Sequence, residues 1–402
     1  MVGRFRLYSI IAGVMSLLLA CADRTIRQPL PVAPIMAAPV AQVCMPDTAA
    51  QQQPEPRKKH ALIVLVHGTI VPWPYTAGIL SLIERLSQKA RFIRYCHESS
   101  IKAIRFTTVY GNQAVGAYGL YGIRSPLVDQ GNLSPASYRL AVGLRTAWDI
   151  ARPDYYEKFH CYTFGWPGLL SIKSRREGGE LLHKTLAKEV QELIQQHSLE
   201  PEDLEVFVFG HSHGGNVALQ MASVHNAHEH GFSVQSLMLF GTPIQRETEE
   251  YARCPLFKKI VSVYSPEDMV QVMDIFSAAG FWPGRRFSQA YLATAQEGKI
   301  HQVAVRVDGI SPSHAELWFF RDALGALYRS RLSIAPLPVV LFAPFIIETL
   351  RPIDSSQHNL TLSLVAKRNA YYMSFENFEG ISIDTHHACI EKAPLEKLWP
   401  IR

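Results

Sequence analysis

The sequence predicts an α/β fold: a mostly parallel central sheet flanked by helices. From about residue 60 onward, short apolar runs alternate with longer amphipathic runs. The run 61–66 (ALIVLV) is apolar throughout, as expected of a strand that is buried on both faces of a parallel sheet. The run 180–197 places its apolar residues on one helical face and its charges on the other. Strands that alternate with such helices are typical of α/β domains.

Two stretches interrupt this alternation. Residues 111–153 are long for a strand-to-helix connection and rich in Gly, Tyr, Leu and Arg, which favours an ordered cap-like insertion. Beyond about residue 326, the runs 360–366 and 370–375 predict a hairpin in a small C-terminal appendage. Further strands are predicted at 105–110, 160–165, 205–209, 236–240, 259–264 and 301–307, and a further helix at 79–90.

The chain therefore divides into four predicted parts. Residues 22–59 are rich in Pro, Ala and Gln and have no sustained period, which indicates a disordered tether. The tether joins a leader at 1–21 to an α/β domain at 60–326, which includes the possible cap or lid at 111–153. Residues 327–402 form the C-terminal extension, in which β structure is expected.

Composition excludes some classes of partner. The chain has 402 residues, 48% hydrophobic and 19% charged, which is ordinary for a globular protein. The net charge of +5 is weak, and no basic block stands out beyond residues 57–59. This balance argues against a nucleic-acid partner, and no protein partner is indicated.

The six cysteines give no sign of a metal site. No CxxC or Cys/His spacing typical of zinc is present, and no motif requires a metal or an organic cofactor. Cys161 lies in a predicted strand and is expected to be a small core residue. The histidine run at 225, 228 and 230 is interpreted as a solvated helix end rather than a metal site.

The amino terminus has the pattern of a secretion signal. Arg4 and Arg6 precede an apolar run at 8–20 that is too short to span a membrane comfortably. The next residues, LLAC at 18–21, resemble the lipobox of bacterial lipoproteins. This resemblance implies export and a lipid anchor on Cys21, with an outer-membrane or periplasmic location. The alternative is a plain signal peptide, cleaved near Ala20 or Ala22, in which Cys21 is incidental.

The stretch GHSHG at 210–214 is the strongest chemical signal in the chain. A hydroxyl needs an exposed position, a neighbouring base and donors for the developing oxyanion before it acts as a nucleophile. Gly-x-Ser-x-Gly supplies that position when it follows a strand and opens a helix. Here a buried-type strand runs directly into the motif, and NVALQM continues as a helix. Ser212 is therefore the candidate nucleophile, whereas a glycine turn with a bystander serine is the alternative.

This motif and its flanking strands resemble the nucleophile elbow of the α/β-hydrolase superfamily, and more narrowly its lipases and esterases. The resemblance covers roughly residues 59–326 and implies a triad in the chain order Ser, acid, His. It implies an oxyanion hole made by the backbone amides of Thr69, in VLVHGT, and of His213. In the family the position of His67 is structural, so His67 is not expected to be the base. Gly-Thr-Pro at 241–243 further supports the fold.

The acid and the base are expected after later strands. Asp268, in KIVSVYSPEDMV, matches the family's acid position, and Glu267 is the rival. His314 lies between the strand at 301–307 and a predicted helix from Ala315, which matches the family's base. Either carboxylate would orient the imidazole and stabilise its charged form. His211 is expected to pack, although it neighbours the serine.

The expected function is therefore hydrolysis of carboxylic esters, with an ester or lipid substrate and a membrane reached through lipidated Cys21. Thioesterase, phospholipase or amidase activity on the same triad is the first alternative. A non-catalytic surface protein that retains the fold for binding is the second, and an intact Ser, acid and His in order speak against it.

Overall fold

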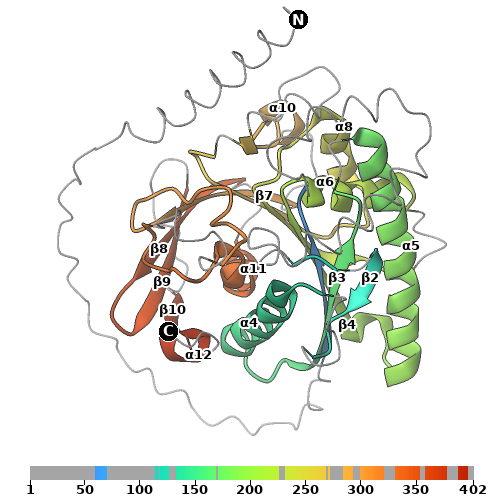
Figure 1. The fold of residues 1–402 in the computed structure, drawn as a ribbon, viewed down its shortest axis with the longest axis horizontal. Coiled ribbons are helices and arrows are strands. Elements are labelled where there is room, and N and C mark those ends of the chain that lie inside the picture. Colours follow the sequence, from blue (N-terminus) through green and yellow to red (C-terminus); the bar gives the residue numbers. More distant parts are fainter. Residues whose placement is uncertain are drawn as a thin grey trace, which may run out of the picture. The chain divides into compact units, whose positions relative to one another are not determined.

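The computed structural model describes residues 59–69, 114–116, 118–125, 133–168, 171–225, 231–268, 270–271, 284–292, 299–320, 331–353, 358–377 and 388–396. Within these residues, one ten-stranded sheet forms the centre of the fold and helices cover both of its faces (Figure 1). The α/β class predicted from the sequence is confirmed.

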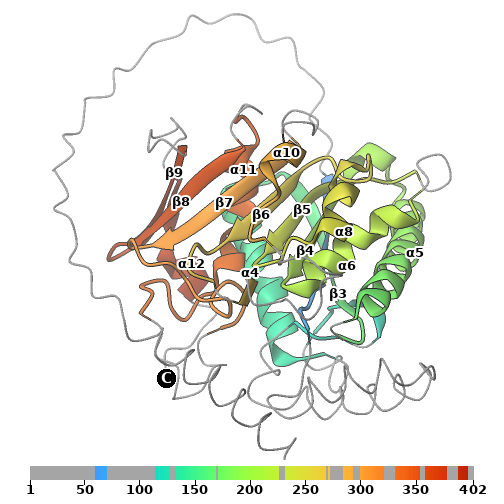
Figure 2. The same ribbon diagram turned by 90° about the horizontal axis from the view of Figure 1, so that it is seen from above.

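The sheet is parallel through its centre and antiparallel at both edges. Its order is β10-β9-β8-β7-β6-β5-β4-β1-β3-β2 (Figure 2). All neighbours from β3 to β8 pair in parallel, whereas β2, β9 and β10 pair antiparallel with their neighbours. The strands are β1 (Lys59–Val66), β2 (Gly119–Gly122), β3 (Tyr156–Gly165), β4 (Leu204–His211), β5 (Val234–Phe240), β6 (Ile260–Tyr264), β7 (Ile300–Val307), β8 (Asn359–Ala366), β9 (Ala370–Asn377) and β10 (Ala388–Glu391).

The longer helices begin at sequence signals that cap their first turn. Ser134 Oγ accepts a hydrogen bond from Ser137 N at 3.3 Å, and Pro135 occupies the first helical turn. Ser171 Oγ caps the next helix in the same way, through Ser174 N. The α-helices are α4 (Pro135–Ala151), α5 (Ile172–His197), α6 (His213–Gln220), α8 (Arg246–Glu249), α10 (Gln289–Leu292), α11 (Ala343–Leu350) and α12 (Lys392–Glu396), and the short 3-10 helices are η1 (Pro201–Asp203), η2 (Met221–Ser223), η3 (Glu250–Arg253) and η6 (Val339–Phe342).

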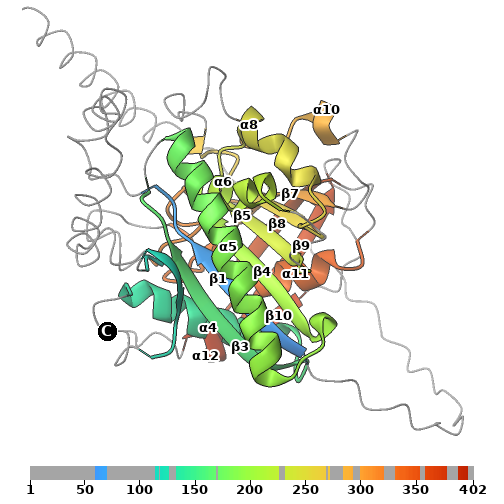
Figure 3. The same ribbon diagram turned by 90° about the vertical axis from the view of Figure 1, so that its right-hand side faces the viewer.

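Each face of the sheet has its own apolar core. Ala61, Ile63 and Leu65 of β1 point to the face covered by α4 and α11. The intervening residues, Leu62 and Val64 among them, point to the face covered by α5 and α6 (Figure 3). Because successive strand residues alternate between two buried faces, the run 61–66 must be apolar at every position.

The C-terminal part differs from the expected appendage. The predicted hairpin exists as β8 and β9, but β8 pairs in parallel with β7 and thereby extends the central sheet. Leu360, Leu362 and Phe375 are buried in the same core as α4 and α11. This position satisfies the backbone groups on the outer edge of β7, which would otherwise remain unpaired.

The described residues of the expected cap also belong to the main fold. β2 pairs with the edge of β3, and α4 packs on the sheet with Trp148 fully buried. The helix expected from Ala315 differs as well, because residues 314–318 form turns. Outside the described residues lie Cys21, the leader at 1–21, almost all of the tether at 22–59, the strand at 105–110 and the helix at 79–90. No described helix is long and apolar enough to cross a membrane.

A buried carboxylate holds the amino-terminal end of the sheet together. Glu205 accepts hydrogen bonds from Tyr156 at 2.6 Å, from Tyr155 at 2.9 Å and from Lys59 at 3.0 Å. Burial alone would raise the pKa of Glu205, but these three donors outweigh burial and hold its pKa below the ordinary value. The ionised form is therefore the one that stabilises the fold.

Replacement of Glu205 by Gln should lower the free energy of unfolding by about 2 kcal/mol at pH 7, because three donors lose a charged acceptor. This contribution is present above the unfolded-state pKa of the carboxyl and is lost as the pH falls through its lower folded-state pKa. Urea unfolding at pH 7 and at successively lower pH measures both effects. The exposed Glu202→Gln is the matched control. An equal loss in the control, or a difference that persists at the lowest pH, would contradict this account.

Candidate active site

Ser212 occupies a strained turn between β4 and α6. Its φ of 51° and ψ of −130° lie in a region that residues other than glycine rarely adopt, at a cost of about 1–3 kcal/mol. Ser212 N donates to Phe240 O of the neighbouring strand at 2.9 Å, which fixes the turn against β5. The strand-turn-helix context expected for Gly-x-Ser-x-Gly is therefore present.

The glycines around Ser212 are required by close contact between backbones. A Cβ on Gly214 would lie 2.4 Å from the carbonyl oxygens of both Val66 and His67. A Cβ on Gly68 would lie 2.9 Å from Ser212 Cβ. The loop that follows β1 thus passes directly beside the serine.

Asp268 and His314 meet at the same end of the sheet. His314 Nδ1 lies 2.6 Å from Asp268 Oδ2, and the aspartate side chain is fully buried. Asp268 Oδ1 accepts from the backbone amides of Val270 at 2.9 Å and Gln271 at 3.3 Å. A carboxylate that cannot donate must accept from Nδ1–H, so Nε2 is the nitrogen left for proton transfer. Glu267, the rival acid, is exposed.

The turn at 240–243 connects the serine, the acid and the histidine. A Cβ on Gly241, whose φ is +58°, would lie 3.0 Å from His314 Nδ1, so the imidazole packs against this turn. Gln271 Nε2 donates to Thr242 O at 2.9 Å, which ties the acid loop to it. Asn216 Nδ2 donates to Pro243 O at 3.0 Å, which ties α6 to it. Three segments that are distant in sequence are thereby held in one arrangement.

A capping box holds the loop that carries His314, a feature that the sequence analysis missed. Ser313 N donates to a Glu316 carboxylate oxygen at 2.8 Å, and Glu316 N donates to Ser313 Oγ at 3.3 Å. The spacing Ser-x-x-Glu around His314 was visible in the sequence and could have identified this contact. The reciprocal pair fixes the backbone on both sides of the imidazole.

His67 has both ring nitrogens engaged elsewhere. Its Nδ1 donates to Gly68 O at 2.7 Å, and its Nε2 accepts from Trp166 N at 3.3 Å. The rings of His67 and Trp166 also stack, with their centroids 5.7 Å apart. His67 therefore shapes the loop that leads to Thr69 and is not available as a base.

His211 packs against the histidine of the site. Its ring lies 4.8 Å from that of His314 and stacks on Trp318 at 5.4 Å. Burial, and then the proximity of His314, hold the pKa of His211 well below its ordinary value. His211 is therefore neutral, and its Nε2 donates to His314 O at 3.4 Å.

The two expected oxyanion donors lie on the loop after β1 and at the start of α6. Thr69 follows Gly68, and its hydroxyl oxygen is buried without a hydrogen-bond partner among the described residues. His213 is the first residue of α6, so its amide lies at the amino-terminal end of the helix. Asn216 Nδ2 contacts His213 Nδ1 at 3.4 Å, which orients that ring.

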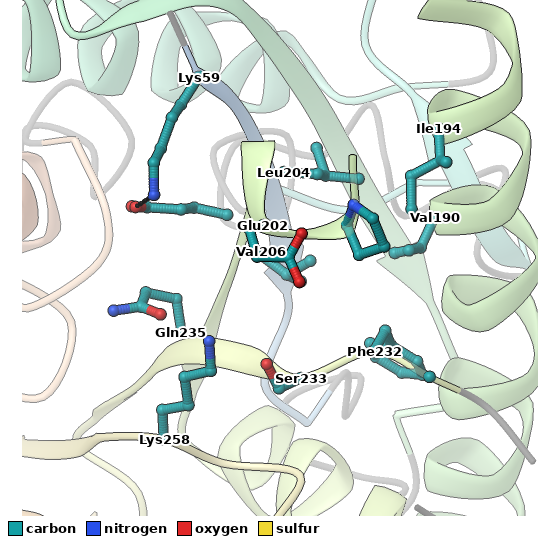
Figure 4. Close-up of a pocket in the computed structure, with 13 residues that line it drawn as sticks. Lys59, Val190, Ile194, Glu202, Leu204, Val206, Phe232, Ser233, Gln235 and Lys258 are labelled. Carbon is teal, nitrogen blue, oxygen red and sulfur yellow. Dashed lines mark hydrogen bonds and ion pairs between the residues drawn. The ribbon is translucent and has the colours of Figure 1, made fainter. Parts of the chain in front are cut away.

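A pocket of about 340 Å³ lies at the opposite end of the sheet (Figure 4). Leu204 at the start of β4 and Lys59 at the start of β1 line it, whereas Ser212 follows the end of β4. The side chains of Lys59 and Lys258 approach this pocket from different sides. Because none of the expected site residues lines this pocket, it is separate from the candidate active site.

The structure brings five expected site residues to one end of the sheet: Ser212, Asp268, His314, Thr69 and His213. Cys21 lies outside the described residues. Comparison of the chain with protein-family models, with curated proteins and with solved structures gave no match.

The bond between Asp268 and His314 should give a low-field proton resonance in ¹H NMR, because a short charge-assisted hydrogen bond deshields its proton. We expect Asp268→Asn to abolish this resonance and the exposed neighbour Glu267→Gln to retain it. Retention in Asp268→Asn, with the fold intact by circular dichroism, would contradict the pairing.

Proposed function

We propose that the protein is a serine hydrolase of the α/β-hydrolase type that cleaves carboxylic esters through Ser212, His314 and Asp268. The observation that carries the proposal is the hydrogen bond from His314 to buried Asp268, placed at the turn that also fixes Ser212. The order nucleophile, acid, base along the chain supports the same assignment.

The chemistry follows from these positions. Ser212 Oγ attacks the ester carbonyl carbon while His314 Nε2 takes the hydroxyl proton. The backbone amides of Thr69 and His213 stabilise the oxyanion. As the tetrahedral intermediate collapses, the carbon–oxygen bond to the alcohol breaks and His314 returns the proton to the leaving oxygen. Water, deprotonated by the same imidazole, then releases the acid from Ser212.

Asp268 contributes by holding the imidazole and by stabilising its positive charge during both steps. Neutral His211 beside His314 adds no competing charge. Thioesters, amides and phospholipid esters can follow the same acyl-enzyme route, because the triad acts on the carbonyl and not on the leaving group. A series of leaving groups with a common acyl chain, compared by kcat/KM, separates these substrate classes.

Ser212→Ala should lower kcat for p-nitrophenyl butyrate by at least about 10³-fold, because the acyl-enzyme cannot form. Ser223→Ala, which removes the hydroxyl of an exposed serine that donates to Gln220 O at 2.8 Å, is the control and should retain activity. Full hydrolysis by a folded Ser212→Ala variant would refute the catalytic assignment.

We further propose that the chain is exported and anchored through a lipid on Cys21, since LLAC at 18–21 follows an apolar run directly. The mature amino terminus should then be a diacylated cysteine, and Cys21→Ser should release the protein from membranes. A mature terminus without lipid in mass spectrometry would count against the anchor.

A further inference from the structure

Three histidines from three different elements meet near the amino-terminal end of the central strands. His60 lies at the start of β1, His160 lies in β3, and His197 is the last residue of α5. His60 is buried, and the other two are half-buried. The described part of the chain has no other such group of potential metal ligands.

The fold itself produces this meeting. In the parallel pair of β1 and β3, Leu62 lies opposite His160, so His60 and His160 share one face of the sheet. Helix α5 covers that face through residues such as Val190 and Leu193 (Figure 3). Its last turn therefore brings His197 over the two strand histidines.

The geometry is that of a ligand set. His60 Nδ1 lies 3.2 Å from His160 Nε2, and one ligand nitrogen from each of the three rings lies within 4.8 Å of the others. Two imidazole nitrogens bound tetrahedrally at about 2.0–2.1 Å from one ion lie about 3.3–3.4 Å apart. The first pair, at 3.2 Å, is close to this separation, and the His197 nitrogen would have to move nearer to the other two for the ion to bind.

The two strand histidines are held in the neutral form. Burial, followed by repulsion from His197, lowers the pKa of His60. Burial, followed by repulsion from His60 and His197, lowers the pKa of His160 to about 4. Neutral imidazole is the form that binds metal. Among the charged neighbours, the carboxylates of Glu157 and Asp203 favour a positive charge on His60, whereas Lys158 opposes one on both His60 and His160.

We propose that His60, His160 and His197 bind one divalent transition-metal ion of the class that imidazole prefers, such as Zn²⁺ or Co²⁺. Because His160 and His197 are only half-buried, solvent supplies the fourth ligand. The ion would connect β1, β3 and α5 across the cluster.

This site is independent of the proposed hydrolysis. Ser212, Asp268 and His314 follow the carboxyl ends of β4, β6 and β7, whereas His60 lies near the amino end of β1. Bound metal is therefore expected to raise stability, because an ion that binds only the folded state shifts the unfolding equilibrium.

The test uses protein treated with EDTA and then titrated with Co²⁺. We expect one equivalent to bind with the visible absorption of tetrahedral cobalt, and Zn²⁺ to displace it. The melting temperature should rise by about 5 °C at saturating metal. His197→Ala should abolish both the spectrum and the rise, while the apo-protein melts close to the wild type, since the His197 side chain is half-buried at a helix end.

His225→Ala is the matched control, because His225 belongs to a separate pair with His183, at 3.1 Å, and should leave binding unchanged. His197→Gln repeats the test with a side chain of similar size if the alanine variant unfolds. Absence of stoichiometric binding, binding that survives both His197 substitutions, or equal loss in His225→Ala would overturn the proposal.

Discussion

The candidate site depends on how closely three backbone segments approach one another at the carboxyl ends of β1, β4 and β5. The positions of Gly68, Gly214 and Gly241 leave no space for a side chain, because a Cβ at any of them would lie within about 3 Å of a neighbouring segment. This approach places the loop after β1 beside Ser212 and the turn after β5 beside His314. The strained backbone of Ser212 persists because these neighbours determine its position.

Hydrogen bonds to main-chain carbonyls of the turn at 240–243 then hold the closely packed site segments in fixed positions. The carbonyls of residues 240, 242 and 243 accept from the amide of Ser212 and from the side chains of Gln271 and Asn216. Each bond joins one site segment to the same turn. Groups held in this way need little reorganisation when charge develops, which is the condition under which electrostatic stabilisation is most effective.

The sequence was most informative about the fold where a hydrophobic pattern is compatible with only one kind of secondary structure. Continuous apolar strands and the helix at 180–197 predicted the α/β sheet, and the resemblance of the Ser212 motif to a nucleophile elbow implied Asp268 and His314 after later strands. The outer parts of the sheet were less predictable, because strands such as β2 and β8 do not reveal their partners in their own residues. The cap was expected from the length and composition of residues 111–153, and the appendage from the break in the alternation beyond about residue 326, although their described residues belong to the sheet and its core.

Contacts between distant segments were also beyond the sequence. The histidines at 60, 160 and 197 have no common motif spacing, and only strand register and the length of α5 bring them together. The capping box formed by Ser313 and Glu316 is visible in the sequence as Ser-x-x-Glu. It matters for the candidate site only because His314 lies between these two residues. The sheet therefore has two chemically distinct ends, one built around Ser212 and the other around imidazoles.

The central claim is that Ser212 is a nucleophile activated by its surroundings. Treatment with a fluorophosphonate, followed by peptide mass mapping, tests this claim most directly. The account predicts one adduct per chain, on the peptide that contains Ser212, and a strongly reduced rate of labelling in a folded His314→Ala variant. Adducts on another serine, or labelling of Ser212 at the same rate without His314, would contradict it.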